Sequence, residues 1–383
     1  MSAPVGSGGC GPVGVGIVGA GVISTQYLDN LGRAADVSVR MIADIDTDRA
    51  AARAEQYGVA ASGTLAELLA RDDVEIVLNL TVPAAHLPVG LEILAAGKHV
   101  WSEKPFALDR EGGRELLAAA RSAGLRVACA PDTVLGAGVQ TARRLIESGA
   151  IGEPLTALTL FQVPGPESWH PSPEFLYARG GGPLFDMGPY YLATLVQLLG
   201  SATRATARGS RARASRVIGS GPRAGERFPV EVPTHIAGII DFAGGVSAQS
   251  TFSFQSSKPA GDVVEISGTE GTLVLPDPNG FDGELRLWRD GHQRAEDAEL
   301  HPAVGSTFSR GAGVVELARA IRAGRPERAS GELGYHVLDT MVALQDSAET
   351  DGRPIDIASR VEVPPALPED WDPRAATLER TLA

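Results

Sequence analysis

The chain has 383 residues, of which 43% are hydrophobic, and this is enough for two domains with sizeable cores. Charged residues make up 21% and the formal net charge is −13, so the composition excludes a disordered chain and disfavours nucleic acid as a partner. The two cysteines, Cys10 and Cys129, lie far apart, which disfavours a disulfide scaffold. No apolar run approaches the roughly 20 residues of a membrane span and no leader pattern precedes the first strand, so we expect a cytoplasmic protein without a membrane partner.

The first third of the chain alternates between strands and helices. Strands are predicted over residues 13–18, 37–44, 74–81, 98–105 and 125–131, with a helical pattern between each pair. Such alternation is typical of a doubly wound parallel sheet, so we expect an α/β chain whose Rossmann domain spans 13–131 and follows a flexible N-terminus, 1–12.

A glycine-rich turn, GAGVIS (19–24), follows the first strand and opens a helix. Gly19 suits the tight turn, Gly21 lets a pyrophosphate approach the helix N-terminus, and Ser24 is small enough for close packing. Asp44 ends the second strand about twenty residues later, where a carboxylate binds ribose hydroxyls and repels a 2′-phosphate. The pattern predicts NAD as the cofactor, with NADP disfavoured; the alternative is a glycine turn without a nucleotide.

Lysine is rare in this chain. It occurs only at Lys98, Lys104 and Lys258, so 31 of the 34 basic residues are arginine. Lys104 follows a predicted strand at its carboxyl end, which is where open parallel sheets bind ligands. A Lys–Pro bond can adopt the cis form and would then fix the direction of the lysine. The alternative is a surface lysine at the end of a strand.

The rest of the chain has a different pattern. Strand-like runs broken by Gly and Pro predict one large open, mostly antiparallel sheet with a helix over 186–199 on one face. Further helices are predicted over 314–324 and 331–352. We expect a C-terminal α+β domain over 132–360 for substrate binding and oligomerisation. Residues 361–383 are predicted to be a mobile tail or an arm packed on a neighbouring subunit.

The segment GGGPLFDMGPYY (180–191) joins three glycines to the start of that helix and places Asp186 and Tyr190 on one helix face. The glycines either let the backbone come close to a ligand or form an ordinary loop.

Together these segments resemble the glucose–fructose oxidoreductase / inositol dehydrogenase / rhizopine-catabolism (Gfo/Idh/MocA) family of NAD(P)-dependent oxidoreductases. The likeness rests on GAGVIS, Asp44, the 81–86 segment, Glu103-Lys104-Pro105 and the 180–200 segment. It implies hydride transfer between a ring C–OH of a sugar, glycoside or cyclitol and NAD, in a homodimer or homotetramer joined by the C-terminal sheet. It assigns the cofactor to Gly19, Gly21, Val22, Ile23, Asp44, Thr81, Val82, Pro83, His86, Glu103 and Lys104.

The same resemblance implies that Lys104 polarises the substrate oxygen and that Asp186 orients Lys104. The family commonly has histidine where this chain has Tyr190, and its later acid is Ala193 here. An ordinary phenol has a pKa of about 10, against about 6.5 for imidazole, so a tyrosine base needs positive charge nearby. Three proton acceptors therefore stay open: Tyr190, Lys104 and His170. For His170 the alternative, a surface or hydrogen-bonded histidine, is somewhat favoured.

Two rival functions also stay open. One is an enzyme that keeps NAD bound and oxidises a sugar transiently for elimination or epimerisation. The other is a nucleotide-sensing regulator without catalysis, which the retention of both Lys104 and Asp186 disfavours. No cluster of His, Cys and acidic residues has metal-ligand spacing, so we expect no metal.

Overall fold

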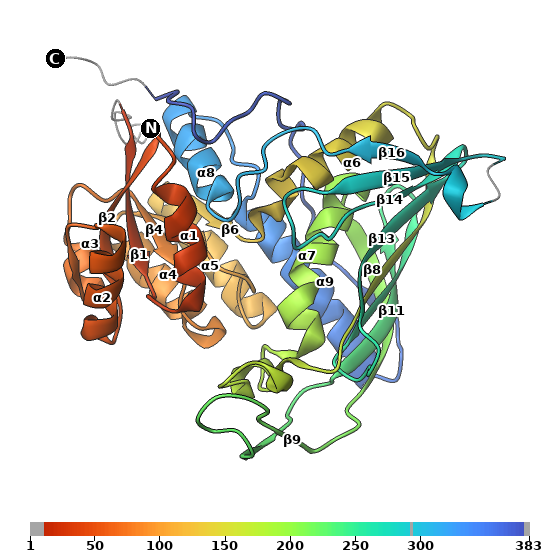
Figure 1. Ribbon diagram of the computed structural model, residues 1–383, viewed down its shortest axis with the longest axis horizontal. Helices are drawn as coiled ribbons and strands as arrows, with labels where there is room; N and C mark the ends of the chain where they lie inside the picture. Colours follow the sequence, from red (N-terminus) through yellow and green to blue (C-terminus); the bar gives the residue numbers. More distant parts are fainter. Residues whose placement is uncertain (1–10, 292–293, 379–383) are drawn as a thin grey trace.

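The computed structural model describes residues 11–291 and 294–378 and contains two large sheets side by side (Figure 1). The expected α/β class, with a Rossmann sheet followed by a large mostly antiparallel sheet, is confirmed. Most of the predicted flexible N-terminus, together with Cys10, lies outside the described residues.

The first sheet has six parallel strands in the order β3-β2-β1-β4-β5-β6. Its strands are β1 Val13–Val18, β2 Val37–Ala43, β3 Ser62–Gly63, β4 Ile76–Asn79, β5 His99–Ser102 and β6 Val127–Cys129. Its helices are α1 Val22–Leu31, α2 Thr47–Tyr57, α3 Leu65–Leu69, α4 His86–Ala95 and α5 Arg110–Ala123. The strand order reverses between β1 and β4, which places a ligand-binding crevice at their carboxyl ends. β3 and α3 were not predicted, because elements this short carry no periodic signal.

The second sheet has nine strands in the order β16-β15-β14-β13-β7-β12-β11-β8-β17, and all neighbours are antiparallel except β7 and β12. Its strands are β7 Pro154–Gln162, β8 Ala202–Ser210, β11 His235–Phe242, β12 Ser247–Ser253, β13 Ala260–Gly268, β14 Gly271–Val274, β15 Glu284–Arg289, β16 Glu299–Pro302 and β17 Ile355–Asp356. Two short strands, β9 Ser215–Val217 and β10 Arg227–Pro229, pair separately.

Four helices connect the two sheets. They are α6 Ala137–Glu147, α7 Gly182–Leu199, α8 Ala312–Ala323 and α9 Gly331–Glu349. α7 and α9 pack on one face of the nine-stranded sheet, while α8 and α9 also contact β6 of the parallel sheet (Figure 1). α7 packs against α6 and α9 and against strands β7, β11 and β12 of the nine-stranded sheet. It begins at Gly182 rather than at the expected residue 186, because Pro183 is tolerated in a first helical turn.

The C-terminal segment, expected to be a mobile tail or an arm on a neighbour, has contacts within its own chain. Its described part, residues 361–378, packs along its own chain. The Leu367 N–H donates to Gln140 Oε1 at 2.7 Å, and the Arg319 guanidinium lies 5.5 Å from the ring centroid of Trp371. The last described residues of the segment contact Asp36, whose side chain is 0% exposed.

Asp36 is surrounded by donors from distant parts of the chain. It accepts bonds from the Thr377 N–H at 2.8 Å, the Leu378 N–H at 2.9 Å and Arg319 Nε at 2.7 Å. Burial works to raise the pKa of Asp36, but the bonds from Thr377, Leu378 and Arg319 outweigh it and hold the pKa below its usual value. The segment is thus fastened to the parallel sheet by a charged carboxylate.

Asp36→Asn should therefore lower the free energy of unfolding by roughly 3 kcal/mol at neutral pH, since it leaves Arg319 without its buried partner. Because the folded pKa is depressed, this stabilisation is present at neutral pH and is lost as the pH falls through the acid range. Thermal denaturation at neutral pH and near pH 4 checks both statements. Asp356→Asn, which removes an exposed partner of Arg204, is the control and should cost less than about 1 kcal/mol. Equal costs for the two variants would contradict the prediction.

Candidate active site

Two glycines of the glycine-rich turn have different roles. The backbone conformation requires a glycine at position 19, whereas the glycine at position 21 leaves open space beside the helix. Gly19 has a φ of +102°, and a Cβ there would lie 2.5 Å from the Leu80 carbonyl oxygen. Gly21 is extended, and a Cβ there would meet nothing within 4 Å. The Ser24 hydroxyl closes the turn by donating to the Gly21 carbonyl at 2.7 Å. The first turn of α1 is therefore open on the side where a pyrophosphate would bind.

Two substitutions separate these roles. Gly21→Ala should fold like the wild type yet bind NAD about tenfold more weakly, because the methyl group would fill the space for the pyrophosphate. Gly19→Ala should lose about 1–3 kcal/mol of stability from backbone strain. Calorimetric titration with NAD and thermal denaturation measure the two effects. Unchanged NAD affinity in Gly21→Ala would place the nucleotide elsewhere.

Exposed apolar side chains surround this turn at the carboxyl ends of β1, β2 and β4. Val22 is 84% exposed, Ile45 is 101% exposed and Val82 is 60% exposed. Large apolar groups so exposed at one crevice indicate a surface that a ligand covers. Ile23 is half-buried and packs on the core of the parallel sheet instead. Ile45 was not predicted, although it directly follows the acid that ends β2.

Asp44 lies at the end of β2, as predicted, and is almost fully hydrogen-bonded. Its carboxylate accepts from the Ala20 N–H at 2.7 Å, from the Asp46 N–H at 2.9 Å and from Arg49 Nη2 at 2.6 Å. Burial works to raise the pKa of Asp44, but Arg49 and the backbone donors hold it below its usual value. Arg49, 47% exposed, is a second polar group at this position that the sequence did not single out.

The 81–86 segment after β4 is held from behind by buried polar groups. Thr81 Oγ1 donates to Asn79 Oδ1 at 2.6 Å, and Asn79 Nδ2 donates to the His86 carbonyl at 2.9 Å. The His86 ring lies between the carbonyl oxygens of Pro105 (2.8 Å) and Thr81 (3.0 Å) and is 1% exposed. His86 thus joins this segment to the one that carries Lys104, whereas Pro83 opens the short helical turn that follows Val82. Asn79 was not predicted.

Glu103 lies beneath Lys104, and its carboxylate is used within the protein. Its Oε1 accepts from the Tyr27 hydroxyl at 2.7 Å, and its Oε2 accepts from the Lys104 N–H at 3.1 Å. The Trp101 indole donates to the same Tyr27 oxygen at 3.0 Å. This buried network fixes the backbone from which Lys104 projects.

Lys104 and Asp186 form the ion pair that the resemblance implied. The Lys104 Nζ lies 2.9 Å from Asp186 Oδ1 and 2.8 Å from the Asp186 carbonyl oxygen, and the two side chains are 17% and 24% exposed. The Lys104–Pro105 bond is cis. Burial works to lower the pKa of Lys104, but Asp186, Tyr190 and Glu103 raise it well above its usual value. The ammonium stays charged, and the third of its three N–H donors is left for a ligand.

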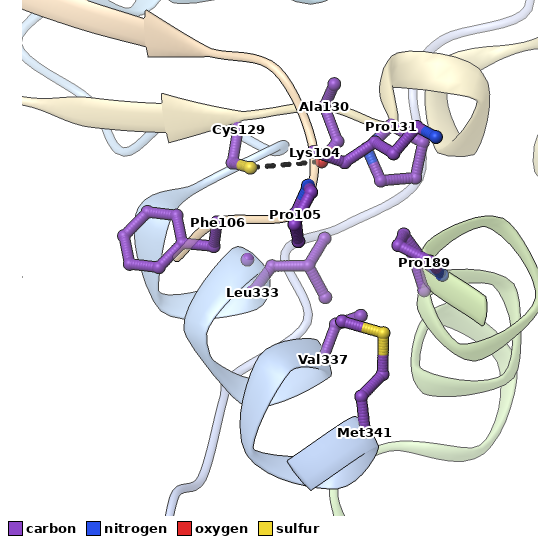
Figure 2. Close-up of a pocket in the computed structure, with 12 residues that line it drawn as sticks. Lys104, Pro105, Phe106, Cys129, Ala130, Pro131, Pro189, Leu333, Val337 and Met341 are labelled. Atoms are coloured by element: carbon purple, nitrogen blue, oxygen red, sulfur yellow. Dashed lines mark hydrogen bonds between the residues drawn. The ribbon is translucent and has the colours of Figure 1, made fainter. Parts of the chain in front are cut away.

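A small apolar hollow lies behind this pair. Figure 2 shows Pro105, Pro131, Pro189, Val337 and Met341 converging there from the β5 and β6 loops, α7 and α9. Ala193 also lines the hollow, at the position where the family carries an acid. Most of the hollow is apolar, although Lys104 also lines it, so alanine at position 193 packs among mainly apolar side chains.

Tyr190 lies one turn after Asp186 on α7 and is 6% exposed. The Lys104 Nζ is 5.3 Å from the centroid of its ring, and Arg310 Nη2 donates to its hydroxyl at 3.2 Å. Arg310 was not predicted, because one arginine among 31 carries no local signal. The structure therefore brings Lys104, Asp186, Tyr190 and Arg310 together.

His170 lies in the loop between β7 and α7, apart from the hydrogen bonds of this group. Its Nδ1 accepts from the Ser172 N–H at 3.0 Å, so the neutral ring carries its proton on Nε2. The ring packs edge-on between Trp169 and Phe175, at 5.5 Å and 5.4 Å between centroids. Burial lowers the pKa of His170, against opposing effects of Glu174 and Asp186. Trp169 is 67% exposed, so it is free to contact a ligand.

The described residues contain neither a cluster of metal-binding side chains nor a helix suited to a membrane. Within 11–291 and 294–378, no group of three or more His, Cys, Asp or Glu side chains could hold a metal ion. None of the helices in those ranges is long and apolar enough to cross a bilayer.

Comparison with known proteins identifies both parts of the chain. Residues 13–130 match the profile of an oxidoreductase family with an NAD-binding Rossmann fold, and residues 139–274 match the GFO/IDH/MocA C-terminal domain. The two profiles belong to one family and cover the sequence from β1 to β14.

Individual relatives extend over most of the chain. The 1,5-anhydro-D-fructose reductase of Ensifer adhaerens is 30% identical over 264 residues, 68% of this chain and 74% of that protein. The trans-1,2-dihydrobenzene-1,2-diol dehydrogenase of Bos taurus is 29% identical over 314 residues, 80% of this chain and 86% of that protein. A levoglucosan dehydrogenase solved with NADH and L-sorbose superposes with a TM-score of 0.78 at 21% identity, covering 91% of this chain and 100% of that one. The last likeness concerns the fold.

Proposed function

Because the chain belongs to the Gfo/Idh/MocA family of NAD-binding oxidoreductases, we propose that it oxidises a ring hydroxyl of a sugar, glycoside or cyclitol. The observation that carries this proposal is the Lys104–Asp186 pair beside Tyr190, at the carboxyl end of β5. The relatives named above act on sugars and a diol, which supports a substrate with neighbouring hydroxyl groups.

The crevice fits NAD. Gly21 leaves open space at the start of α1, exposed Val22, Ile45 and Val82 offer an apolar surface, and Asp44 lies where the adenosine ribose would bind. When bound, NAD supplies the acceptor for the hydride of the alcohol.

Each protein group then has a defined task. The free N–H of Lys104 donates to the substrate hydroxyl oxygen and stabilises the negative charge that develops there. Asp186 holds the ammonium in place through two of its donors. Tyr190 takes the hydroxyl proton as the alcohol becomes a ketone, so that proton and hydride leave in different directions.

The three candidate proton acceptors are no longer equivalent in this proposal. Lys104 is held as a charged ammonium by Asp186, so it has no lone pair to accept a proton. The Nδ1 of His170 is used by Ser172, and its Nε2 carries the proton of the neutral ring. Tyr190 is hydrogen-bonded by Arg310 and lies against Lys104, which favours it as the acceptor.

We also propose NAD rather than NADP, because the Asp44 carboxylate would repel a 2′-phosphate. Arg49 lies beside it at 2.6 Å and would be released by its removal. Asp44→Ser should therefore raise the kcat/KM ratio of NADP to NAD by about tenfold or more, and Asp44→Ser/Arg49→Ala should lose that gain. Steady-state kinetics with both nucleotides measure the ratio. An unchanged ratio in Asp44→Ser would mean that the ribose does not contact Asp44.

The test of the function mixes the protein with NAD and, separately, NADP, across hexoses, pentoses, glycosides and inositols, and follows the absorbance of the reduced nicotinamide. Reduction with a subset of this panel supports the proposal and defines the ring that is recognised. If nucleotide binds but nothing is oxidised, the proposal fails in favour of redox-neutral chemistry on bound NAD or of a regulatory role.

The outer face of the nine-stranded sheet is our candidate for self-association. Leu158 on β7, Gln249 on β12 and Ile239 on β11 lie side by side across three central strands. Leu158 is 39% and Ile239 is 50% exposed, on the face opposite α7 and α9. We propose a homodimer or homotetramer through this face, which analytical ultracentrifugation checks. A cytoplasmic location stays a prediction.

A further inference from the structure

Arg310 is a cation beside Tyr190 that neither the motifs nor the resemblance accounts for. It lies in the loop before α8, 120 residues from Tyr190 in sequence, and its Nη2 donates to the Tyr190 hydroxyl at 3.2 Å. The same nitrogen donates to Asn279 Oδ1 at 2.6 Å. The guanidinium carbon lies 5.7 Å from the centroid of the Tyr190 ring and 6.0 Å from that of Phe281. Arg310 thus contacts Tyr190 in two ways: it donates a hydrogen bond to the hydroxyl, and its guanidinium group lies near the aromatic ring.

The backbone of Arg310 is fixed from two sides. Its carbonyl oxygen accepts from Asn30 Nδ2 on α1 at 2.9 Å. Two backbone N–H groups shortly after it, those of Gly311 and Gly313, donate to the buried Asp132 carboxylate at 2.9 Å and 3.1 Å. A side chain held by α1, by Asn279 and by the start of α8 keeps its direction without a ligand, which lowers the reorganisation needed during a reaction.

The charges around Tyr190 differ in how far they are neutralised. The positive charge of Lys104 is matched by Asp186 on the same helix as Tyr190. Across the described residues, the ion pairs do not include Arg310, whose side-chain hydrogen bonds go to two neutral groups. Asp132 and Glu103 act on Arg310 from a greater distance, and burial raises the pKa of Asp132 to about 6. The phenol oxygen therefore lies beside a positive charge that no carboxylate contacts directly.

Lys104 alone would not place a hydrogen-bond donor with a positive charge at the Tyr190 phenol oxygen. Its ammonium lies over the face of the Tyr190 ring, and it donates hydrogen bonds to Asp186 rather than to the phenol oxygen. An ordinary phenol is mostly protonated at neutral pH, so a tyrosine that accepts protons needs a donor and a positive charge at its oxygen. Among the described side chains, Arg310 supplies both.

We propose that Arg310 is a positioning residue that stabilises the Tyr190 phenolate, and so allows tyrosine to replace histidine as the proton acceptor. This inference rests on the proposed function. In the oxidation, the phenolate oxygen forms an O–H bond with the substrate hydroxyl proton, the carbinol C–H bond gives its hydride to NAD, and a ketone and reduced nicotinamide result. Tyr190 then releases the proton to solvent.

The first test needs no substrate and measures the phenolate directly. The ultraviolet absorbance of the apoprotein is followed against pH, and the titration of Tyr190→Phe is subtracted to isolate one tyrosine. In Arg310→Met the midpoint should lie at a higher pH than in the wild type, since an opposite charge within hydrogen-bonding distance favours the ionised form of the phenol. Arg310→Lys keeps the positive charge but loses the planar set of guanidinium donors, so its titration midpoint should lie between those of the wild type and Arg310→Met.

The second test uses the pH profile of kcat/KM for alcohol oxidation. Its acidic limb should move upward in Arg310→Met by the same amount as the titration midpoint. Arg353→Met, the same change at an exposed arginine, should move neither. NAD binding and thermal denaturation of each variant confirm that it folds.

The outcomes separate this inference from the proposed function. An unchanged midpoint in Arg310→Met overturns the inference, and an accompanying rise in KM alone would make Arg310 a substrate ligand. The midpoint could also rise in Arg310→Met although the wild type oxidises no member of the panel. That result would support the effect of Arg310 on Tyr190 but contradict the proposed function.

Discussion

Lys104→Met should oxidise a ring alcohol about 10³-fold more slowly than the wild type while still binding NAD. Loss of one preorganised donor to a developing oxyanion costs about 10²–10³ in rate, and this substitution also removes the positive charge beside Tyr190. Asp186 is left without its cation, so the remaining groups are misplaced as well. Steady-state kcat/KM with the best substrate of the panel measures the loss.

The control variants for Lys104 distinguish chemistry from charge alone. Lys104→Arg keeps a cation, but a planar guanidinium replaces the compact ammonium that Asp186 holds, so it should recover little of the rate. Lys258→Met removes an exposed lysine and should keep the wild-type rate. Full activity in Lys104→Met would remove Lys104 from the reaction.

Tyr190→Phe should lower kcat/KM by about 10²–10⁴, which is the usual contribution of a positioned acid–base group. The substitution deletes only the hydroxyl that Arg310 contacts and leaves the ring against Lys104. The rate should also lose the acidic limb of its pH profile, because the group that titrates there is gone. A stopped-flow measurement of nicotinamide reduction across the pH range tests both.

Tyr191→Phe provides a matched comparison. It removes a hydroxyl from the next residue, whose ring is fully buried and packs on Phe252 at 5.7 Å between centroids. This variant should keep the wild-type rate. If Tyr190→Phe also turns over at the wild-type rate while Lys104→Met is inactive, Tyr190 is a packing residue and another group accepts the proton.

The parallel sheet could be predicted because its strands and turns each produce a recognisable pattern within a few neighbouring residues. Buried parallel strands give continuous apolar runs such as residues 13–18, and glycines mark the turns between strands and helices. Lys104 could be singled out because lysine is so rare in this chain, and its pairing with Asp186 followed from the family resemblance.

What the sequence did not reveal depends on contacts between distant residues. α6 was missed because it starts at Ala137 after Gly136, which has no side chain to cap the helix. Arg310 and Asn279 meet at Tyr190 only once both sheets are in place, and no spacing in the sequence expresses that. The contact between residues 361–378 and Asp36 was missed for the same reason. A segment rich in Pro and acidic residues has no sequence pattern that indicates which residue it will contact.

The most direct test of the central claim uses a substrate from the panel that carries deuterium at the carbon to be oxidised. After turnover with NAD, mass spectrometry of the recovered nucleotide shows where the deuterium is. We predict one deuterium in each reduced nicotinamide, and a rate of labelling that falls in Lys104→Met and Tyr190→Phe. A ketone formed without deuterium in the nucleotide would contradict hydride transfer at this site.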